Sequence, residues 1–228
     1  GYTTPTPIQA KAIPQVLSGG DLLAGAQTGT GKTAGFTLPI LHILSQKAAD
    51  PSSKGRPRCL MLTPTRELAA QIEESVKTYG KYLPLSSTVI FGGVNANPQI
   101  ARLKKPLDIL VATPGRLEDH MQQGTVRLDD IQILVLDEVD RMLDVGFLPP
   151  MRRIISKISK NRQTLFFSAT LPPEISELAN WALRDPVRIE IGASRSVASI
   201  VKHAVYTVDP ARKFDFLLAL LNSVDFQS

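Results

Sequence analysis

The 228-residue chain contains a single cysteine, Cys59, so it cannot form an internal disulfide. It also has no apolar run near the roughly 20 residues that a membrane-spanning helix needs, and it shows no secretory signal peptide. These absences exclude a disulfide-stapled secreted scaffold and a helical membrane protein. Cys59 lies in a short apolar run and is predicted to pack in a core. A reducing, cytoplasmic setting is therefore expected.

The chain has no methionine at its start, because it opens with Gly1-Tyr2 and its first methionine is Met61. We therefore expect a piece cut from a longer protein. No internal repeat is visible. With 43% hydrophobic residues, a chain of this length can form one large domain, or one domain plus a fragment of another.

Acidic residues are fewer than basic ones, which gives a net charge of +5 and a pI of about 9.4. This balance suits a polyanionic partner without proving one. The densest basic stretch covers residues 151–162. Its apolar residues recur at helical spacing and are expected to face the core: Met151, Ile154, Ile155 and Ile158. The basic residues would then form an outer helix face, and a solvated face is favoured over a binding site.

The most informative segment runs from Ala26 to Thr33 and reads AQTGTGKT. It follows a predicted buried strand over 21–26 and opens a predicted helix. Glycines in such a loop let the backbone turn tightly around an anion, and a helix N-terminus attracts phosphate. Lys32 would reach the β- and γ-phosphates, and the Thr33 hydroxyl would bind Mg²⁺. Ala26 stands where the usual pattern begins with glycine.

A second polar segment, Asp137-Glu138-Val139-Asp140, follows the apolar run 133–136. A carboxylate at the end of a buried strand is costly unless it is paired or bound to a metal. Asp137 is the natural Mg²⁺ partner, and Glu138 the natural base that positions an attacking water. Together with the glycine-rich loop, this segment predicts binding and hydrolysis of a nucleoside triphosphate, with Lys32, Asp137 and Glu138 as the catalytic residues.

Seven apolar runs alternate with helical patterns along most of the chain. This alternation predicts an α/β fold with a mostly parallel sheet and helices on both faces. Ligands in such folds bind at the carboxyl ends of the strands. Besides the strand over 21–26, the predicted strands are Cys59–Thr63, Thr88–Phe91, Ile109–Ala112, Ile133–Leu136, Thr164–Ser168 and Val187–Ile191.

The last part of the chain differs in composition. Residues 192–202 are small and polar and are predicted to be a linker. Residues 203–208 have strand character, and Asp209-Pro210 favours a helix start. The helix that follows carries an apolar stripe of Phe214, Leu217, Leu218 and Leu221. We expect residues 1–191 to form one domain and 203–228 to be the truncated start of a second, whose exposed stripe would promote self-association or disorder.

These motifs resemble those of the DEAD-box family of ATP-dependent RNA helicases, over residues 1 to about 208. The resemblance implies a RecA-like P-loop NTPase domain with ATP and Mg²⁺ as cofactors. In this family Gln9, in the segment Tyr2–Gln9, would read adenine, because its amide offers a donor and an acceptor together; a capped helix start explains the segment equally well. The implied nucleotide-binding residues are Gln9, Thr28, Gly29, Thr30, Gly31, Lys32 and Thr33.

The resemblance also implies sequence-independent contacts to the RNA backbone. Three short motifs would supply them through hydroxyls, helix N-termini and arginines. Each motif alone is more often a structural turn, and their value lies in their order and spacing. Their residues are Pro64, Thr65 and Arg66; Gly92 and Gly93; and Thr113, Pro114, Gly115 and Arg116.

Ser168-Ala169-Thr170 resembles the motif that couples ATP hydrolysis to strand separation, and its hydroxyls could link it to Asp140. A helix cap is the alternative role. Two departures from the family pattern stand out. Val139 replaces the usual alanine, which predicts a small repacking without loss of chemistry. No arginine occurs in the context expected of the family's arginine finger.

The predicted function is therefore that of an ATP-dependent RNA helicase, represented by its first domain. Without an arginine finger, the chain alone should bind nucleotide weakly, hydrolyse it slowly and not unwind duplexes. An RNA clamp that uses ATP without unwinding remains an alternative, because the same motifs serve both. A P-loop enzyme acting on DNA or on a small molecule is a further alternative, which Gln9 and the RNA motifs disfavour.

Overall fold

A computed structural model describes residues 3–27, 29–47, 54–191 and 204–223. The chain forms two compact units, Gly1–Ser194 and Arg195–Ser228. Each unit is described separately. Thr28 and the predicted linker 192–202 lie outside the described residues.

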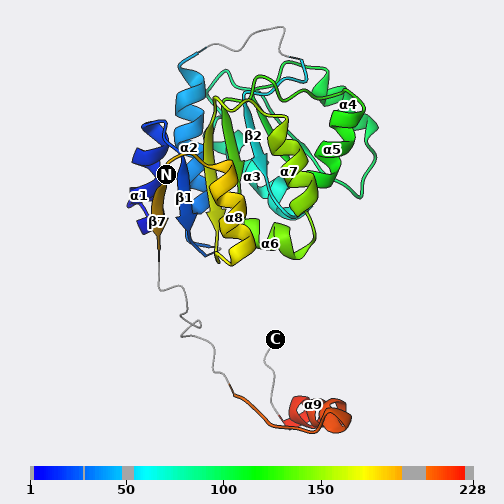
Figure 1. The fold of residues 1–228 in the computed structure, drawn as a ribbon. Coiled ribbons are helices and arrows are strands. Elements are labelled where there is room, and N and C mark those ends of the chain that lie inside the picture. Colours follow the sequence, from blue (N-terminus) through cyan, green and yellow to red (C-terminus); the bar gives the residue numbers. More distant parts are fainter. Residues whose placement is uncertain (1–2, 28, 48–53, 192–203, 224–228) are drawn as a thin grey trace. The chain divides into compact units, whose positions relative to one another are not determined.

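The first unit is built on a seven-stranded sheet in the order β3-β4-β2-β5-β6-β1-β7 (Figure 1). Every pairing between neighbouring strands is parallel, so the predicted mostly parallel sheet is fully parallel. Each of the seven strands predicted for this unit forms, with ends that differ by one residue at most. The strands are β1 (Leu22–Gly25), β2 (Cys59–Leu62), β3 (Ser87–Ile90), β4 (Ile109–Ala112), β5 (Ile133–Leu136), β6 (Gln163–Ser168) and β7 (Val187–Glu190).

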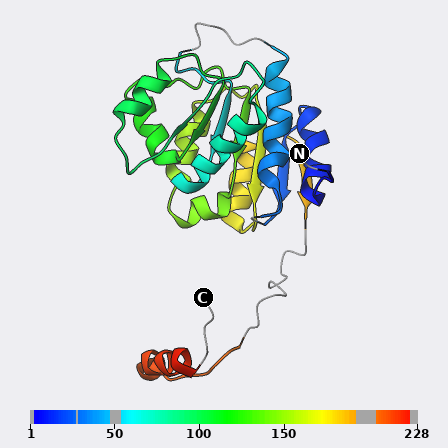
Figure 2. The same cartoon turned by 180° about the vertical axis from the view of Figure 1, so that it is seen from behind.

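Helices cover both faces of this sheet, as Figures 1 and 2 show from opposite sides. One face packs against α1 (Pro7–Leu17), α2 (Lys32–Ser45) and α3 (Arg66–Tyr79). The other face packs against α4 (Asn97–Leu103), α5 (Pro114–Gln122), α6 (Val139–Asp144), α7 (Leu148–Ser156) and α8 (Pro173–Ala182). None of the helices described is both long and apolar enough to span a bilayer.

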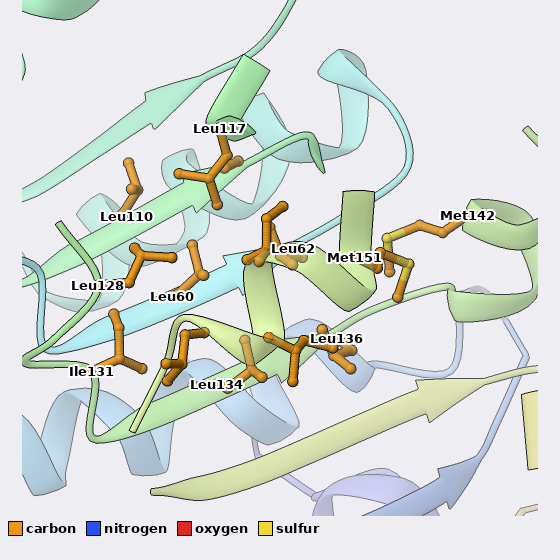
Figure 3. Close-up of a cluster of buried hydrophobic side chains, with 14 of the residues drawn as sticks. Leu60, Leu62, Leu110, Leu117, Leu128, Ile131, Leu134, Leu136, Met142 and Met151 are labelled. Carbon is orange, nitrogen blue, oxygen red and sulfur yellow. The ribbon is translucent and has the colours of Figure 1, made fainter. Parts of the chain in front are cut away.

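The continuous apolar strands serve two cores at once, because successive side chains of a strand point to opposite faces. In β5, Ile133 and Val135 join the core beneath α1 to α3. Leu134 and Leu136 join the core beneath α4 to α8. Figure 3 shows this second core, in which leucines of β2, β4 and β5 meet Leu117, Met142 and Met151 of the covering helices. Burial on both faces explains why these strands have no polar alternation.

Helix boundaries follow local chemistry. The Thr6 hydroxyl accepts from the Gln9 backbone N–H, and the Gln9 side chain accepts from the Thr6 N–H, which forms a capping box at the start of α1. Thr65 caps α3 by accepting from the Leu68 N–H. The basic segment behaves as predicted in its first part: α7 buries Met151, Ile154 and Ile155, but it ends at Ser156, so residues 157–162 are not helical.

The second unit contains a short 3₁₀ turn over Pro210–Arg212 and the helix α9 (Lys213–Ser223). Asp209 caps the turn, and its side chain accepts from the Ala211 N–H. The predicted strand over 203–208 is wrong for its described part, because residues 204–208 have no regular structure. A strand needs a neighbour to satisfy its backbone groups, and no strand is described in this unit. The apolar stripe of α9 is exposed, with Phe214 at 74%.

Candidate nucleotide and RNA site

The phosphate loop connects β1 to α2 at the carboxyl edge of the sheet. Gly29 and Gly31 have φ angles of +82° and +89°, which glycine adopts without strain. A Cβ atom on Gly31 would lie 2.7 Å from the Gln9 Nε2 atom. The Thr30 hydroxyl donates to the Gln27 carbonyl at 2.8 Å and steadies the turn. The backbone angle therefore favours glycine at position 31, and a Cβ there would also displace the end of the Gln9 side chain.

Lys32 begins α2 and points toward the end of β5. Its Nζ atom lies 3.4 Å from Asp137 Oδ1, and both side chains are at most 6% exposed. The pairing follows from sheet order, because β1 and β5 both neighbour β6. Burial raises the pKa of the Asp137 carboxyl, and the Lys32 charge opposes this rise. The structure thus brings together the two segments that the sequence keeps more than a hundred residues apart.

The Lys32 ammonium is buried, and within the described part of the chain it has no hydrogen-bond acceptor of good geometry. An ammonium has three donors, and leaving them unmet in a buried site is costly. Phosphate oxygens at the adjoining loop would satisfy them. This unmet requirement is the observation by which the site fits a nucleotide.

Glu138 has a left-handed backbone, with φ of 54° and ψ of 53°. A residue with a side chain adopts this conformation only at a cost, and such strain gathers at functional sites. Its backbone N–H donates to Asp137 Oδ1 at 3.0 Å. Arg141 lies 3.6 Å from its carboxylate. The turn thus places Glu138 next to Asp137, at the end of the strand that carries the partner of Lys32.

Gln9 is 3% exposed and ties the first helix to the phosphate loop. Its Nε2 donates to the Gly31 carbonyl at 3.2 Å, and its Oε1 accepts from the Thr6 N–H at 3.0 Å. Each of these bonds uses one of the two hydrogen-bonding positions on its atom. One donor and one acceptor position remain for a ligand. The two roles weighed for this segment, helix cap and adenine reader, are therefore compatible.

Asp140 and the segment Ser168–Thr170 form one hydrogen-bonded unit. Asp140 Oδ2 accepts from the Ala169 N–H at 3.1 Å and from the Thr170 N–H at 3.0 Å, and the Thr170 hydroxyl lies 3.2 Å away. In return, the Asp140 N–H donates to the Ser168 hydroxyl at 3.2 Å. The end of β6 is thus tied to the acidic turn after β5, as the coupling hypothesis requires.

The three predicted RNA motifs follow β2, β3 and β4, which are neighbours in the sheet. Thr65 and Thr113 each stand at the N-cap of a helix. A Cβ atom on Gly93 would lie 3.3 Å from Arg66 Nη1, so the glycine pair and Arg66 are adjacent. Arg116 Nη2 donates to the Val94 carbonyl at 2.9 Å. These loops form one surface beside the nucleotide site.

Two buried polar atoms beneath these loops lack hydrogen-bond partners within the described part of the chain. Arg116 Nη1 and Thr63 Oγ1 are buried and have no hydrogen-bond partner among the described residues. Pro64 follows Thr63 directly, and a Cβ atom on Gly92 or on Gly115 would meet no other atom within 4 Å. The backbone at both glycines is therefore open to close approach by a ligand.

Sequence reasoning missed three participants. Thr6 fills the space beside Gly31 together with Gln9, Arg141 pairs with Glu138, and the Val94 carbonyl anchors Arg116. For Thr6 only its contact with Gly31 was missed, since the capped helix start considered for Tyr2–Gln9 already included this residue. Arg141 and Val94 had no signal, because their roles depend on turns that the sequence does not specify.

The residues also suit a magnesium ion. Mg²⁺ in phosphate sites is held through one or two carboxylates together with phosphates and waters, not by a dedicated protein cage. Among the described residues, no group of three or more His, Cys, Asp or Glu side chains is placed so that it could hold a metal ion by itself. Asp137 and the Thr33 hydroxyl, at the second residue of α2, are the ligands the chain can offer.

Comparison with known proteins gives a consistent result. The DEAD/DEAH box helicase family matches residues 6–178. The chain is 40% identical over 226 residues to DEAD-box ATP-dependent RNA helicase 20 of Arabidopsis thaliana, covering 98% of this chain and 45% of that protein. The chain spans less than half the length of the curated relatives it matches.

Solved structures show the same fold. The yeast DEAD-box splicing factor Prp28 superposes with a TM-score of 0.82 and 34% identity, over 98% of this chain and 53% of that one. A hypothetical ATP-dependent RNA helicase from Sulfolobus tokodaii superposes with a TM-score of 0.75 and 34% identity, over 84% of this chain and 54% of that one. The phosphate loop, the acidic turn and the parallel sheet thus occur together in a chain that belongs to the DEAD/DEAH box helicase family.

Proposed function

We propose that this chain is the nucleotide-binding part of an ATP-dependent RNA helicase, an enzyme that couples ATP hydrolysis to local unwinding of RNA duplexes. The observation that carries the proposal is the buried Lys32 ammonium, 3.4 Å from Asp137 and without a hydrogen-bond acceptor among the described residues. A triphosphate seated on the loop would supply the missing oxygens. Family membership supports this assignment.

Each residue at the phosphate site has a distinct role in the proposal. Gln9 reads the adenine with its remaining donor and acceptor. Gly29 to Thr33 would surround the phosphates, and Thr33 and Asp137 would hold Mg²⁺. When bound, the ion would neutralise charge on the phosphates. Glu138 positions the attacking water and accepts its proton.

RNA would bind across the loops that follow β2, β3 and β4. Arg66, Arg116, Thr65 and Thr113 would contact phosphate oxygens, and the glycines would let the strand approach the backbone. Such contacts carry no sequence information, so the proposal names RNA in general. The bonds from Asp140 to Ser168–Thr170 would transmit the state of the nucleotide to the rest of the enzyme.

We further propose that residues 1–191 form the first helicase domain, that 192–202 link it to a second, and that 203–228 begin that second domain. The exposed stripe on α9 supports self-association of this chain, because apolar side chains gain by leaving water. A cytoplasmic location completes the proposal, on the grounds of cysteine usage alone.

The test is the ATPase rate with and without single-stranded RNA, measured on this chain and on a version extended through a whole second domain. We expect RNA stimulation only in the extended protein, because the chain offers no arginine finger. Glu138→Gln in both proteins controls for contaminating ATPases. Robust RNA-stimulated turnover by this chain alone would contradict the expected need for a second domain. No response in either protein would contradict the helicase assignment. A stimulated ATPase that displaces no strand would favour the clamp.

A further inference from the structure

A cavity of about 530 Å³ opens on the side of the sheet farthest from the phosphate loop. It lies between the end of α7, the end of α8 and the start of β6, at Thr164. The coupling residue Ser168 is at the other end of the same strand. At about 3.3 Å per residue, the strand separates the cavity from the nucleotide site by over 10 Å. Its volume is in the range of small-ligand sites.

Three cationic side chains line this cavity, namely Lys160, Arg162 and Arg184. None of them makes an ion pair with any described residue. The arginines of neighbouring α7 behave differently, since Arg152 pairs with Glu177 and Arg153 with Glu118. The solvated face predicted for the basic segment therefore applies to α7, whereas its last two cations belong to a separate cluster.

The positive charge of this cluster is held close together. Burial lowers the pKa of the Arg162 guanidinium, and the charge of Arg184 lowers it further. The carboxylate that attracts Arg162 is Asp21. Asp21 is itself buried, and its two oxygens accept the backbone N–H groups of Thr164 and Arg184, each at 2.7 Å. An anion entering the cavity would add to the attraction that Asp21 already exerts on Arg162.

Arg162 also has a structural role. Its guanidinium donates to the Thr164 hydroxyl at 3.1 Å and to the carbonyls of Ser159 and Ala182 at 2.9 and 3.4 Å. These bonds use three of its five N–H groups. Arg184 uses its Nη2 on the Arg162 carbonyl. The guanidiniums are thus held in place with donors left over, which is a preorganised arrangement for an oxyanion.

An aromatic ring completes the cavity. Trp181, the chain's only tryptophan, lies on α8 in the cavity wall. It is 51% exposed, whereas tryptophan side chains are on average highly buried. The buried side chains of Ile155 and Ile158 also line the cavity. An exposed aromatic ring beside unpaired cations is the combination that binds single-stranded nucleic acid, in which bases stack and phosphates pair. An acidic peptide would use the cations but has no need of the indole face.

We propose that this cavity binds a nucleotide unit of a single-stranded nucleic acid, with its phosphate at Arg162 and Arg184 and its base against Trp181. It would be a second contact for the strand, at the sheet edge opposite the loops of the proposed RNA surface. The inference rests on the proposed function only in taking RNA as the strand.

Because Trp181 is the only tryptophan, its fluorescence reports on this cavity alone. The experiment titrates the nucleotide-free chain with decauridylate and follows Trp181 emission. The test variant is Lys160→Gln/Arg184→Gln, which keeps Arg162 and its structural bonds. The matched control is Lys104→Gln/Lys105→Gln, two exposed lysines between α4 and β4. We expect saturable quenching that the test variant weakens about 10-fold at low salt, with less than about a 2-fold effect of the control.

Other probes set the limits of the inference. Equal quenching by AMP would assign the cavity to free nucleotides, and equal quenching by polyglutamate would assign it to an acidic protein; either result overturns the proposal. Anisotropy of labelled decauridylate is read in parallel. If RNA binds by anisotropy while Trp181 emission does not change, the second contact is absent and the proposed function stands. If RNA does not bind this chain at all, the second contact is absent, and the ATPase test on the extended protein decides the proposed function separately.

Discussion

At the scale of single residues, the site shows how burial and backbone strain mark function. Glu138 occupies a left-handed conformation at the end of a buried strand. Asp137 and Lys32 are buried beside it as an ion pair. A buried ion pair is weak evidence for stability, because desolvation offsets its attraction. Its presence is better explained by the ligand it is arranged to bind.

Glu138→Gln tests the assigned base. The amide keeps the size of the side chain but cannot accept a proton, so ATP hydrolysis should fall about 10²-fold or more. Nucleotide affinity should change less than about 2-fold, because the phosphate contacts remain. Single-turnover hydrolysis and fluorescent-nucleotide binding, both on the extended protein, separate the two effects. A parallel loss of affinity would show that Glu138 acts in binding.

His120 provides a pH-dependent prediction away from the site. It is fully buried, and its Nδ1 lies 2.8 Å from the Thr125 hydroxyl. That hydroxyl donates its hydrogen to the His120 carbonyl, so Nδ1 must carry the proton in the Nδ1–Thr125 bond. Nε2 has no partner among the described residues. Burial, and the charge of Arg116 after it, lower the pKa of His120.

A lowered pKa in the folded state means that the unfolded chain takes up the proton first as pH falls. His120 therefore contributes stability above its unfolded pKa of about 6.5, and this is lost as pH falls toward the folded pKa. We expect His120→Gln to flatten the fall in the free energy of unfolding between about pH 7 and 5, by up to about 1.4 kcal/mol per pH unit. Urea denaturation across this range measures it, and superimposable slopes for the two proteins would contradict the assignment.

At the scale of elements, the phosphate loop depends on α1 as much as on its own glycines. The α1 capping box places the Gln9 amide against Gly31, so a helix at the start of the chain shapes a loop more than twenty residues later. The acidic turn and β6 are tied in a comparable way through Asp140. These contacts between elements explain why the motifs act as a unit.

Gly31→Ala tests this dependence, with Gly29→Ala as its matched control. Both positions have positive φ, so both substitutions carry backbone strain of about 1–2 kcal/mol. Only the Gly31 Cβ would meet other atoms, at 2.7 Å from Gln9 Nε2 and 3.0 Å from Thr6 Oγ1. Displacing the Gln9 amide should cost about 1–2 kcal/mol more, through its lost hydrogen bonds. Chemical denaturation compares the two, and equal losses would show that the Gln9 contact is unimportant.

At the scale of the whole molecule, both hydrophobic cores consist of residues from the first unit. No residue described in the tail, 204–223, belongs to either core. Deleting residues 195–228 should therefore leave the melting temperature within about 2 °C, since each kcal/mol shifts it by about 2–4 °C in a domain of this size. Calorimetry of the two chains measures this, with Leu134→Ala as a core control expected to cost about 2–5 kcal/mol. A large fall on deletion would mean that the tail packs on the first unit.

The same tail tests self-association. If the stripe on α9 supports it, sedimentation should show a concentration-dependent species for the full chain that is absent after deletion of residues 195–228. Leu217→Ser/Leu221→Ser should have the same effect without shortening the chain, because it removes apolar surface that is about half exposed. A full chain that stays monomeric at all concentrations would contradict self-association through α9.

Much of this molecule could be read without coordinates, because its strongest signals are local. Buried parallel strands need continuous apolar runs, so the strand Leu22–Gly25 could be predicted from its sequence. Helices that bind phosphate are commonly preceded by glycines, so the loop after this strand could be predicted too. Strand order, the contact of Gln9 with Gly31 and the gathering of Lys160, Arg162 and Arg184 join residues distant in the sequence. Those pairings are set by how the sheet and helices pack, which no short segment encodes. The failed strand over 204–208 has the same cause, since a strand forms only where a neighbour completes its hydrogen bonds.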